Sequence, residues 1–181
     1  MTIKGKLLCT GRTDTGRVRE HNEDSIAVDG DIGLVVLADG MGGYNAGEVA
    51  SGMAVKTIVE MVSTALQRED LQKPDPVTGL MRTSIILRDA ILRANKVIYQ
   101  SARTQAQYEG MGTTVVAILF HDNRASVAHV GDSRSYRLRN RKLEQITVDH
   151  SLLQELIDRG YYTAEEAQHA ANKNYVTRAL G

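Results

Sequence analysis

Short apolar runs bounded by glycine and aspartate open the chain and predict β-strands. Residues 25–28 and 33–38 are rich in aliphatic side chains, and the turn-forming residues 29–31 separate them. Runs of this length between turn residues are typical of neighbouring strands. The second run leads directly into Asp39-Gly40, which we interpret as a turn that holds a carboxylate at the end of a buried strand.

Two longer stretches follow in which apolar residues recur every three or four positions, the spacing of a helix that buries one face. They predict helices over residues 48–66 and from residue 80 to about residue 103, with a proline-containing surface connection at residues 67–79. The candidate core positions are Val49, Met53, Val55, Ile58, Val59 and Val62 in the first helix and Ile85, Leu92, Ala94, Val97 and Ile98 in the second.

Four further apolar segments lie close together in the second half of the chain and predict strands. Because short turns connect them, we expect the strands to pair in an antiparallel way. The segments are residues 113–120, 124–130, 135–139 and 143–147.

Helices return towards the end of the chain. Ser151 with Gln154, and Thr163 with Glu166, match the capping box in which two side chains bond the free amides of a helix start. Gly160 is suited to ending the first of these helices. Strands, two long helices, more strands and short helices in this order predict an α+β domain of packed layers.

Composition narrows the class of protein. The 181 residues are 42% hydrophobic, enough for one core, and we expect a single domain over residues 1–181. The 22 basic and 22 acidic residues cancel, so the net charge favours binding to neither nucleic acid nor an anionic membrane.

Cysteine usage and the N-terminus bear on location. Cys9 is the only cysteine, which excludes an internal disulfide and fits a reducing compartment. No apolar run approaches the roughly 20 residues of a membrane span, and residues 1–5 do not resemble a signal peptide. We therefore expect a cytoplasmic protein.

Acidic residues occur at two places that suit a hard metal ion. Asn22-Glu23-Asp24 precedes the first strand, and Asp39-Gly40 follows the second. Carboxylate oxygens are good ligands for Mg²⁺ and Mn²⁺, and an aspartate followed by glycine offers a side-chain oxygen and an unobstructed backbone carbonyl. Considered alone, the second segment is more typical of an ordinary turn than of a metal site.

Other reaction schemes lack their sequence motifs. The chain has no Gly-x-x-x-x-Gly-Lys-Ser/Thr phosphate loop, no Gly-x-Ser-x-Gly elbow and no His-Glu-x-x-His zinc pattern. The single cysteine, Cys9, also lacks the surrounding pattern expected of a thiol phosphatase, so covalent catalysis has no candidate.

Five short motifs occur in an order that closely resembles the metal-dependent serine/threonine protein phosphatases of type 2C, in their bacterial form. The resemblance extends from residue 10 to residue 181. The motifs are Arg19–Ser25, Asp39–Gly43, Gly112–Thr114, Gly131–Arg134 and Asp149–Ser151.

The resemblance implies a centre of two Mn²⁺ or Mg²⁺ ions, with a third, weaker site. Asp24 and Asp39 match the positions that bind the two metals, and the Gly40 carbonyl matches a further ligand. Glu23 matches a residue that holds metal-bound water. Asp132 matches a residue of the third site, and an ordinary turn aspartate is the alternative for it.

The resemblance also implies a substrate and partners. Arg19 matches an arginine that grips the substrate phosphate, with Arg17 as the competing candidate. A planar guanidinium can bond two phosphate oxygens at once. The implied substrates are phosphoserine and phosphothreonine on proteins, and the implied partner is a cognate serine/threonine kinase.

The implied fold is an antiparallel β-sandwich flanked by α-helices, with residues 151–181 as a flap segment. In the family, further strands follow this segment and carry two more metal-binding aspartates, which this sequence does not contain. We therefore expect a domain that is incomplete at its C-terminus. Unpaired strand edges and uncovered apolar surface would favour self-association. The alternative function is a non-catalytic phosphoprotein-binding or regulatory module that keeps the fold.

Overall fold

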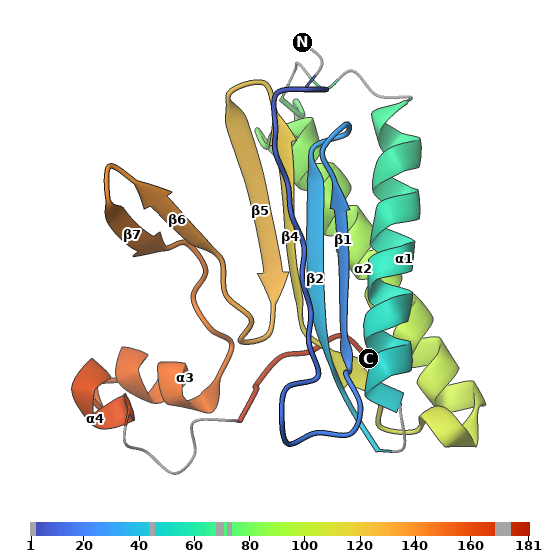
Figure 1. Ribbon diagram of the computed structural model, residues 1–181, viewed down its shortest axis with the longest axis vertical. Coiled ribbons are helices and arrows are strands. Elements are labelled where there is room, and N and C mark those ends of the chain that lie inside the picture. The colour runs from blue at the N-terminus through green and yellow to red at the C-terminus, as the bar shows by residue number, and fades with distance from the viewer. Residues whose placement is uncertain (1–2, 44–45, 68–70, 72–73, 169–174) are drawn as a thin grey trace.

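The computed structural model describes residues 3–43, 46–67, 71, 74–168 and 175–181. Their elements follow the order that the sequence predicts, strands before and after two long helices (Figure 1). The elements are β1 (Asp24–Asp29), β2 (Leu34–Met41), α1 (Ala46–Leu66), α2 (Arg82–Thr104), the 3-10 helix η1 (Ala106–Tyr108), β3 (Gly112–Thr113), β4 (Val115–His121), β5 (Arg124–Val130), β6 (Tyr136–Arg139), β7 (Lys142–Gln145), α3 (Leu152–Asp158) and α4 (Ala164–Gln168).

One antiparallel sheet organises the molecule. Its strand order is β1-β2-β4-β5, and the short strand β3 pairs with the end of β2. Short turns connect β1 to β2 and β4 to β5, as expected for strands that pair in an antiparallel way. The strand β2 therefore lies in the interior of the sheet, with a partner on each side.

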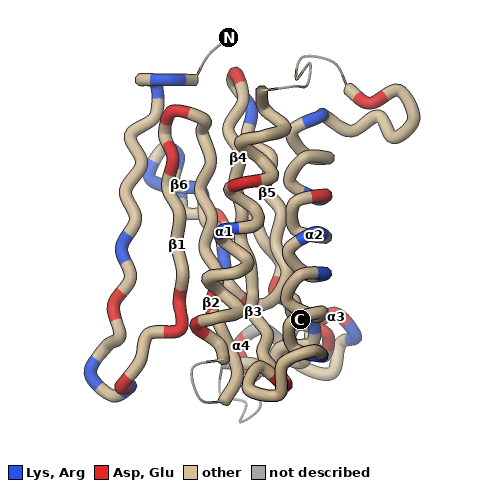
Figure 2. Tube along the Cα trace, turned by 90° about the vertical axis from the view of Figure 1, so that its right-hand side faces the viewer, with Lys and Arg blue, Asp and Glu red and all other residues tan. Residues whose placement is uncertain are grey.

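Helices α1 and α2 cover one face of the sheet (Figure 1). Side chains alternate along β2 and β4, so every second residue points towards the helices. Figure 2 shows Lys and Arg positions recurring along the outer side of α2, as expected for a solvated face. The fully buried residues of this core are Leu34, Val36, Ala38, Ala46, Ala50, Ala54, Ile58, Val62, Leu87, Ala90, Ala94, Ile98, Val115, Ala117 and Leu119.

Helix α1 is long and apolar enough, by length and a mean hydropathy of 1.3, to cross a membrane. In this fold the helix packs against the sheet instead, with Ala54 and Ile58 fully buried. Its exposed positions carry Glu48, Lys56 and Glu60. This division of apolar and charged residues is that of a core helix with one solvated side.

The β6–β7 hairpin and helices α3 and α4 project from the β5 side of the sheet, away from α1 (Figure 1). The expected caps are present, because the Ser151 hydroxyl accepts a bond from the Gln154 amide and the Thr163 hydroxyl accepts one from the Glu166 amide. Gly160 follows α3 with φ +77°, as a helix-ending glycine should. Residues 169–174 of the expected flap segment lie outside the described residues.

Two expectations about individual elements are wrong. The strand β2 does not end before Asp39, because Gly40 and Met41 pair with Thr113 and Gly112 of β3 and extend the strand. Leu92 is not a core residue, because the buried stripe of α2 passes through its neighbour Ile91 and leaves Leu92 59% exposed. The mixed α+β class with an antiparallel sheet and helices is confirmed.

Candidate metal centre

Asp24 and Asp39 face each other across two neighbouring strands. They are direct partners in the β1–β2 register, at the same end of the pair. The next pair, Ser25 and Ala38, lies on the helix side, where the Ser25 hydroxyl bonds Ser51 of α1. Side chains alternate along a strand, so both carboxylates point to the face that the helices do not cover.

The electrostatics of this pair are unfavourable without a cation. Partial burial and the nearby Asp24 raise the pKa of Asp39 to about 6, and the charge of Asp132 adds to the effect, whereas Arg19 opposes it. Like charges directly opposite each other on a sheet are destabilising. A divalent ion between the two carboxylates would remove this repulsion.

The backbone of Asp39 is bonded on both sides by the Gly-Thr-Thr motif. Its amide donates to the Thr114 hydroxyl at 3.1 Å, and its carbonyl accepts from the Thr113 hydroxyl at 3.0 Å and from the Thr114 amide at 2.9 Å. Thr113 and Thr114 are both buried. The position of Asp39 is therefore determined by a segment more than 70 residues away in the chain.

Gly40 permits a close approach between β2 and the start of α1. A Cβ atom at this position would overlap the backbone of Gly47 and would lie 2.7 Å from the Glu23 carbonyl oxygen. The Gly40 amide donates to that same carbonyl at 3.1 Å. No larger residue fits here, so the glycine is required by packing as well as suited to offering its carbonyl to an ion.

Glu23 contacts the start of helix α1. The Glu23 carboxylate lies against the first turn of α1, where a Cβ atom on Gly47 would be 2.6 Å from its oxygen Oε1. A carboxylate at a helix N-terminus is favoured by the helix dipole. The role of Glu23 in holding water at a metal stays a prediction.

The loop before β1 orders the Asp24 carboxylate. The Thr13 hydroxyl donates to Asp24 Oδ2 at 3.3 Å and accepts from the Asn22 side chain at 2.7 Å. Asn22 also accepts from the Asp24 amide at 3.0 Å. Asn22, quoted in the sequence motif without a role, therefore supports the residue two positions later.

Arg19 and Asp132 lie within electrostatic range of Asp39, because the charges of both shift its pKa. Arg19 is exposed and Asp132 is half-buried in the turn after β5. The structure thus brings Arg19 into the field of the acidic pair, and the choice between Arg19 and Arg17 as the phosphate-binding residue stays a prediction.

The described residues supply part of the ligand set of a hard divalent ion. Within the described ranges, no group of three or more His, Cys, Asp or Glu side chains is placed to hold a metal ion. Two carboxylates and a backbone carbonyl are nevertheless a donor set that suits Mg²⁺ or Mn²⁺, since Mg²⁺ in particular is often bound by one or two carboxylates and retains several waters. Asp24, Asp39 and Gly40 would hold such an ion.

Thr114 belongs to the Gly112–Thr114 motif, but the sequence alone did not indicate a role for this residue. Its hydroxyl bonds the Asp39 amide and also lies 2.8 Å from the Ser133 hydroxyl. Thr114 therefore connects the turn that carries Asp132 to the strand that carries Asp39. The only sequence signal for this role is that Thr114 places a hydroxyl group directly before an apolar strand.

Comparison with known proteins identifies the family. The family model for protein phosphatase 2C matches residues 14–174. A serine/threonine phosphatase, Stp, of Listeria monocytogenes is 41% identical over 176 residues, which are 94% of this chain and 65% of that protein. The chain belongs to the protein phosphatase 2C family.

Solved structures show the same fold. The serine/threonine phosphatase Stp1 of Staphylococcus aureus superposes with a TM-score of 0.81 at 36% identity, over 100% of this chain and 68% of that one. The catalytic domain of the phosphatase PstP in complex with two manganese ions superposes with a TM-score of 0.74 at 38% identity, over 93% of this chain and 64% of that one. This chain thus spans about two thirds of the length of these relatives.

We expect Asp39→Asn to stabilise the chain in chelator while removing its response to metal. A raised pKa means that Asp39 favours folding below pH 3.8 and that this contribution is lost as the pH rises through about 6. Asparagine removes the repulsion, so Tm at pH 7 should rise by roughly 2–4 °C, and by less at pH 4. Mn²⁺ should raise the Tm of the wild type but not of the variant.

Thermal unfolding at pH 4 and pH 7, in chelator and in Mn²⁺, tests this expectation. Asp89→Asn on the exposed side of α2 is the matched control and should change neither Tm nor the Mn²⁺ response. A lower Tm for Asp39→Asn at both pH values in chelator would contradict the electrostatic account of the acidic pair.

Proposed function

We propose that this chain is a metal-dependent phosphatase that hydrolyses phosphoserine and phosphothreonine monoesters on proteins. The observation that carries the proposal is the Asp24–Asp39 pair, held face to face by strand pairing in a chain of the protein phosphatase 2C family. The similarity to serine/threonine phosphatases, one of them solved with two manganese ions, supports it.

Different residues of the chain would bind the metal ions, orient water and bind the phosphate. Asp24, Asp39 and the Gly40 carbonyl hold the ions, which when bound neutralise phosphate charge and make water a nucleophile at neutral pH. Glu23 orients water at the first turn of α1. Arg19 binds two oxygens of the phosphate, and its exposure leaves it free to meet a substrate on the protein surface.

Partners follow from this chemistry. The substrates are phosphoproteins, and a serine/threonine kinase must supply them because no other reaction class makes these monoesters on proteins. We further propose that the chain associates with a second copy through its apolar surface opposite the helices. Leu37 and Val127 are exposed on that sheet face, and Leu138 and Leu143 form an exposed cross-strand pair on the β6–β7 hairpin.

Hydrolysis of p-nitrophenyl phosphate and of a phosphothreonine peptide tests the proposed activity. We expect turnover with Mn²⁺, none in chelator, and a loss of about 10²-fold or more in kcat/KM for Asp39→Asn, because charge at the reacting phosphate is no longer neutralised. The Listeria relative serves as positive control for the assay. Binding of Mn²⁺ and of the phosphopeptide without turnover would instead favour the non-catalytic module.

Arg19→Ala should raise KM for the phosphopeptide by roughly 10-fold, because a hydrogen bond to a charged group is worth about 1.5–3 kcal/mol. Arg17→Ala is the matched control, an arginine two positions away in the same loop, and its KM should equal that of the wild type. Steady-state kinetics at saturating Mn²⁺ make the comparison. A higher KM for Arg17→Ala alone would transfer the phosphate-binding role to Arg17.

Sedimentation velocity at several protein concentrations tests the association. We expect a concentration-dependent dimer that Leu138→Lys weakens, because a charge would enter an apolar contact from a side chain that is 71% exposed in the single chain. Leu92→Lys, on the opposite side of the molecule at 59% exposure, should leave the dimer unchanged. A monomer at all concentrations would overturn the proposal.

A further inference from the structure

His150 bonds the turn that carries Asp132. Its backbone amide donates to the Gly131 carbonyl at 3.0 Å, and its ring nitrogen Nδ1 accepts from the Gly131 amide at 3.2 Å. Both polar groups of the Gly131 backbone are therefore occupied by one residue. The pairing is equivalent to a short piece of β-ladder in which a side chain replaces one carbonyl.

Gly131 is enclosed on its other side by Thr114. A Cβ atom at Gly131 would lie 2.6 Å from the Thr114 methyl carbon, and the residue has φ +105°, so no other residue fits. Thr114 in turn bonds the Ser133 hydroxyl and the Asp39 amide. The turn around Asp132 is thus held between His150 and the residue that fixes Asp39.

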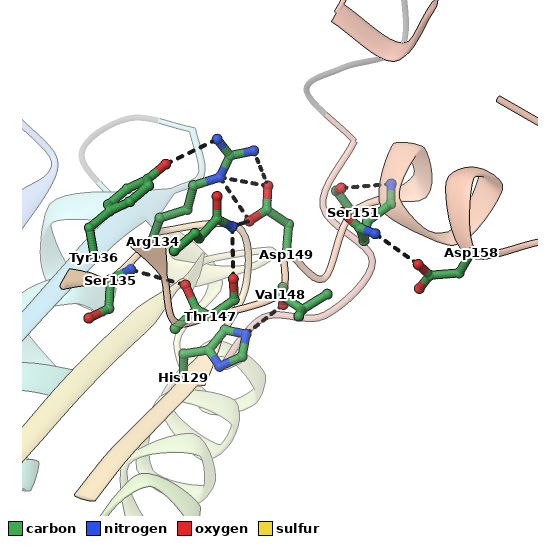
Figure 3. Close-up of polar contacts among 11 residues, drawn as sticks. His129, Arg134, Ser135, Tyr136, Thr147, Val148, Asp149, Ser151 and Asp158 are labelled. Atoms are coloured by element: carbon green, nitrogen blue, oxygen red, sulfur yellow. Dashed lines mark hydrogen bonds and ion pairs between the residues drawn. The ribbon is translucent and has the colours of Figure 1, made fainter. Parts of the chain in front are cut away.

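A second contact, between Arg134 and Asp149, also holds the turn around Asp132 (Figure 3). The Arg134 guanidinium binds both carboxylate oxygens of Asp149, with bonds of 2.6 to 3.0 Å. Asp149 also accepts from Gln145, and the Ser135 amide donates to the buried Thr147 hydroxyl at 3.0 Å. Residues on both sides of Asp132 are therefore bonded to the segment that contains His150.

The His150 ring has one tautomer that fits. Nδ1 accepts a hydrogen bond, so the neutral ring must carry its proton on Nε2. His129 stacks on the ring at a centroid distance of 4.6 Å and bonds the Val148 carbonyl through its own Nε2 at 2.7 Å. Burial, His129 and Arg178 lower the pKa of His150, and Asp149 opposes them, so the neutral form that the contact needs is favoured.

We infer that His150 is a positioning residue that, through Nδ1 and its backbone amide, holds the Gly131–Asp132 turn so that the Asp132 carboxylate faces Asp39. The His150 carbonyl also accepts a hydrogen bond from the Thr177 amide at 2.8 Å. The segment after β7 is thereby joined to the acidic site through one residue. The inference rests on the proposed metal centre and identifies the residue that holds the Asp132 turn near its two aspartates.

Mn²⁺ binding by calorimetry, with the metal alone, tests this role in a double-mutant cycle. His150→Ala should weaken the binding that depends on Asp132 by roughly 10-fold, the effect of removing a partner that orients a ligand. His150→Asn should restore most of it, because the amide oxygen can replace Nδ1 as acceptor. In an Asp132→Ala background, His150→Ala should cause no further loss.

Amide hydrogen exchange at Gly131, followed by NMR in metal-free protein, is the second readout. We expect faster exchange in His150→Ala and near wild-type exchange in His150→Asn. His121→Ala, at the opposite end of β4, is the matched control and should change neither Mn²⁺ binding nor Gly131 exchange. Thermal unfolding identifies any variant that has lost the fold, in which case His150→Asn carries the test.

The outcomes separate this inference from the proposed function. Unchanged Mn²⁺ binding in His150→Ala, or a loss that persists in the Asp132→Ala background, would overturn the positioning role. If the wild type binds no Mn²⁺, the metal centre fails, and the Gly131 amide alone decides the inference. Unchanged exchange at that amide in His150→Ala would then overturn it.

Discussion

The pairing of β1 with β2 is the constraint on which the site depends. It places two aspartates directly opposite each other, an arrangement that costs free energy in the absence of a cation. The remaining contacts resist separation of the pair: the Gly-Thr-Thr motif bonds the Asp39 backbone, and Thr13 and Asn22 surround Asp24. The core between the sheet and two helices supplies the stability that such a local repulsion requires.

The same constraint explains why several residues of the site are small. Gly40 allows the carboxyl end of β2 to reach the start of α1, and Gly131 allows the next acidic turn to lie against Thr114. A side chain at either position would displace a strand end that carries an aspartate. Close backbone approach is therefore how this fold brings acidic segments from distant parts of the chain to one place.

Polar contacts extend from the acidic pair to the last part of the described chain. Thr114 joins Asp39 to Ser133, and His150 joins Gly131 to Thr177. Polar groups that satisfy one another make such a network rigid. The apolar side of the sheet away from the helices contrasts with it, because Leu37 and Val127 there remain exposed.

The sequence by itself determined the elements and the chemistry. Local patterns located the two long helices, the two short α-helices and the strands other than β3 to within a few residues, since apolar spacing and capping residues act over a few positions, but they did not indicate β3 or η1. The order of the motifs indicated the family, and the resemblance identified Asp24, Asp39 and Arg19 as candidate site residues. Only the tertiary structure decided that Asp39 lies within a strand, that Leu92 is exposed, that Glu23 lies against the start of α1, and that Thr114 and His150 support the site. The physical reason is that each of these depends on a contact between segments far apart in the chain, and no local pattern contains the register or helix phase that creates it.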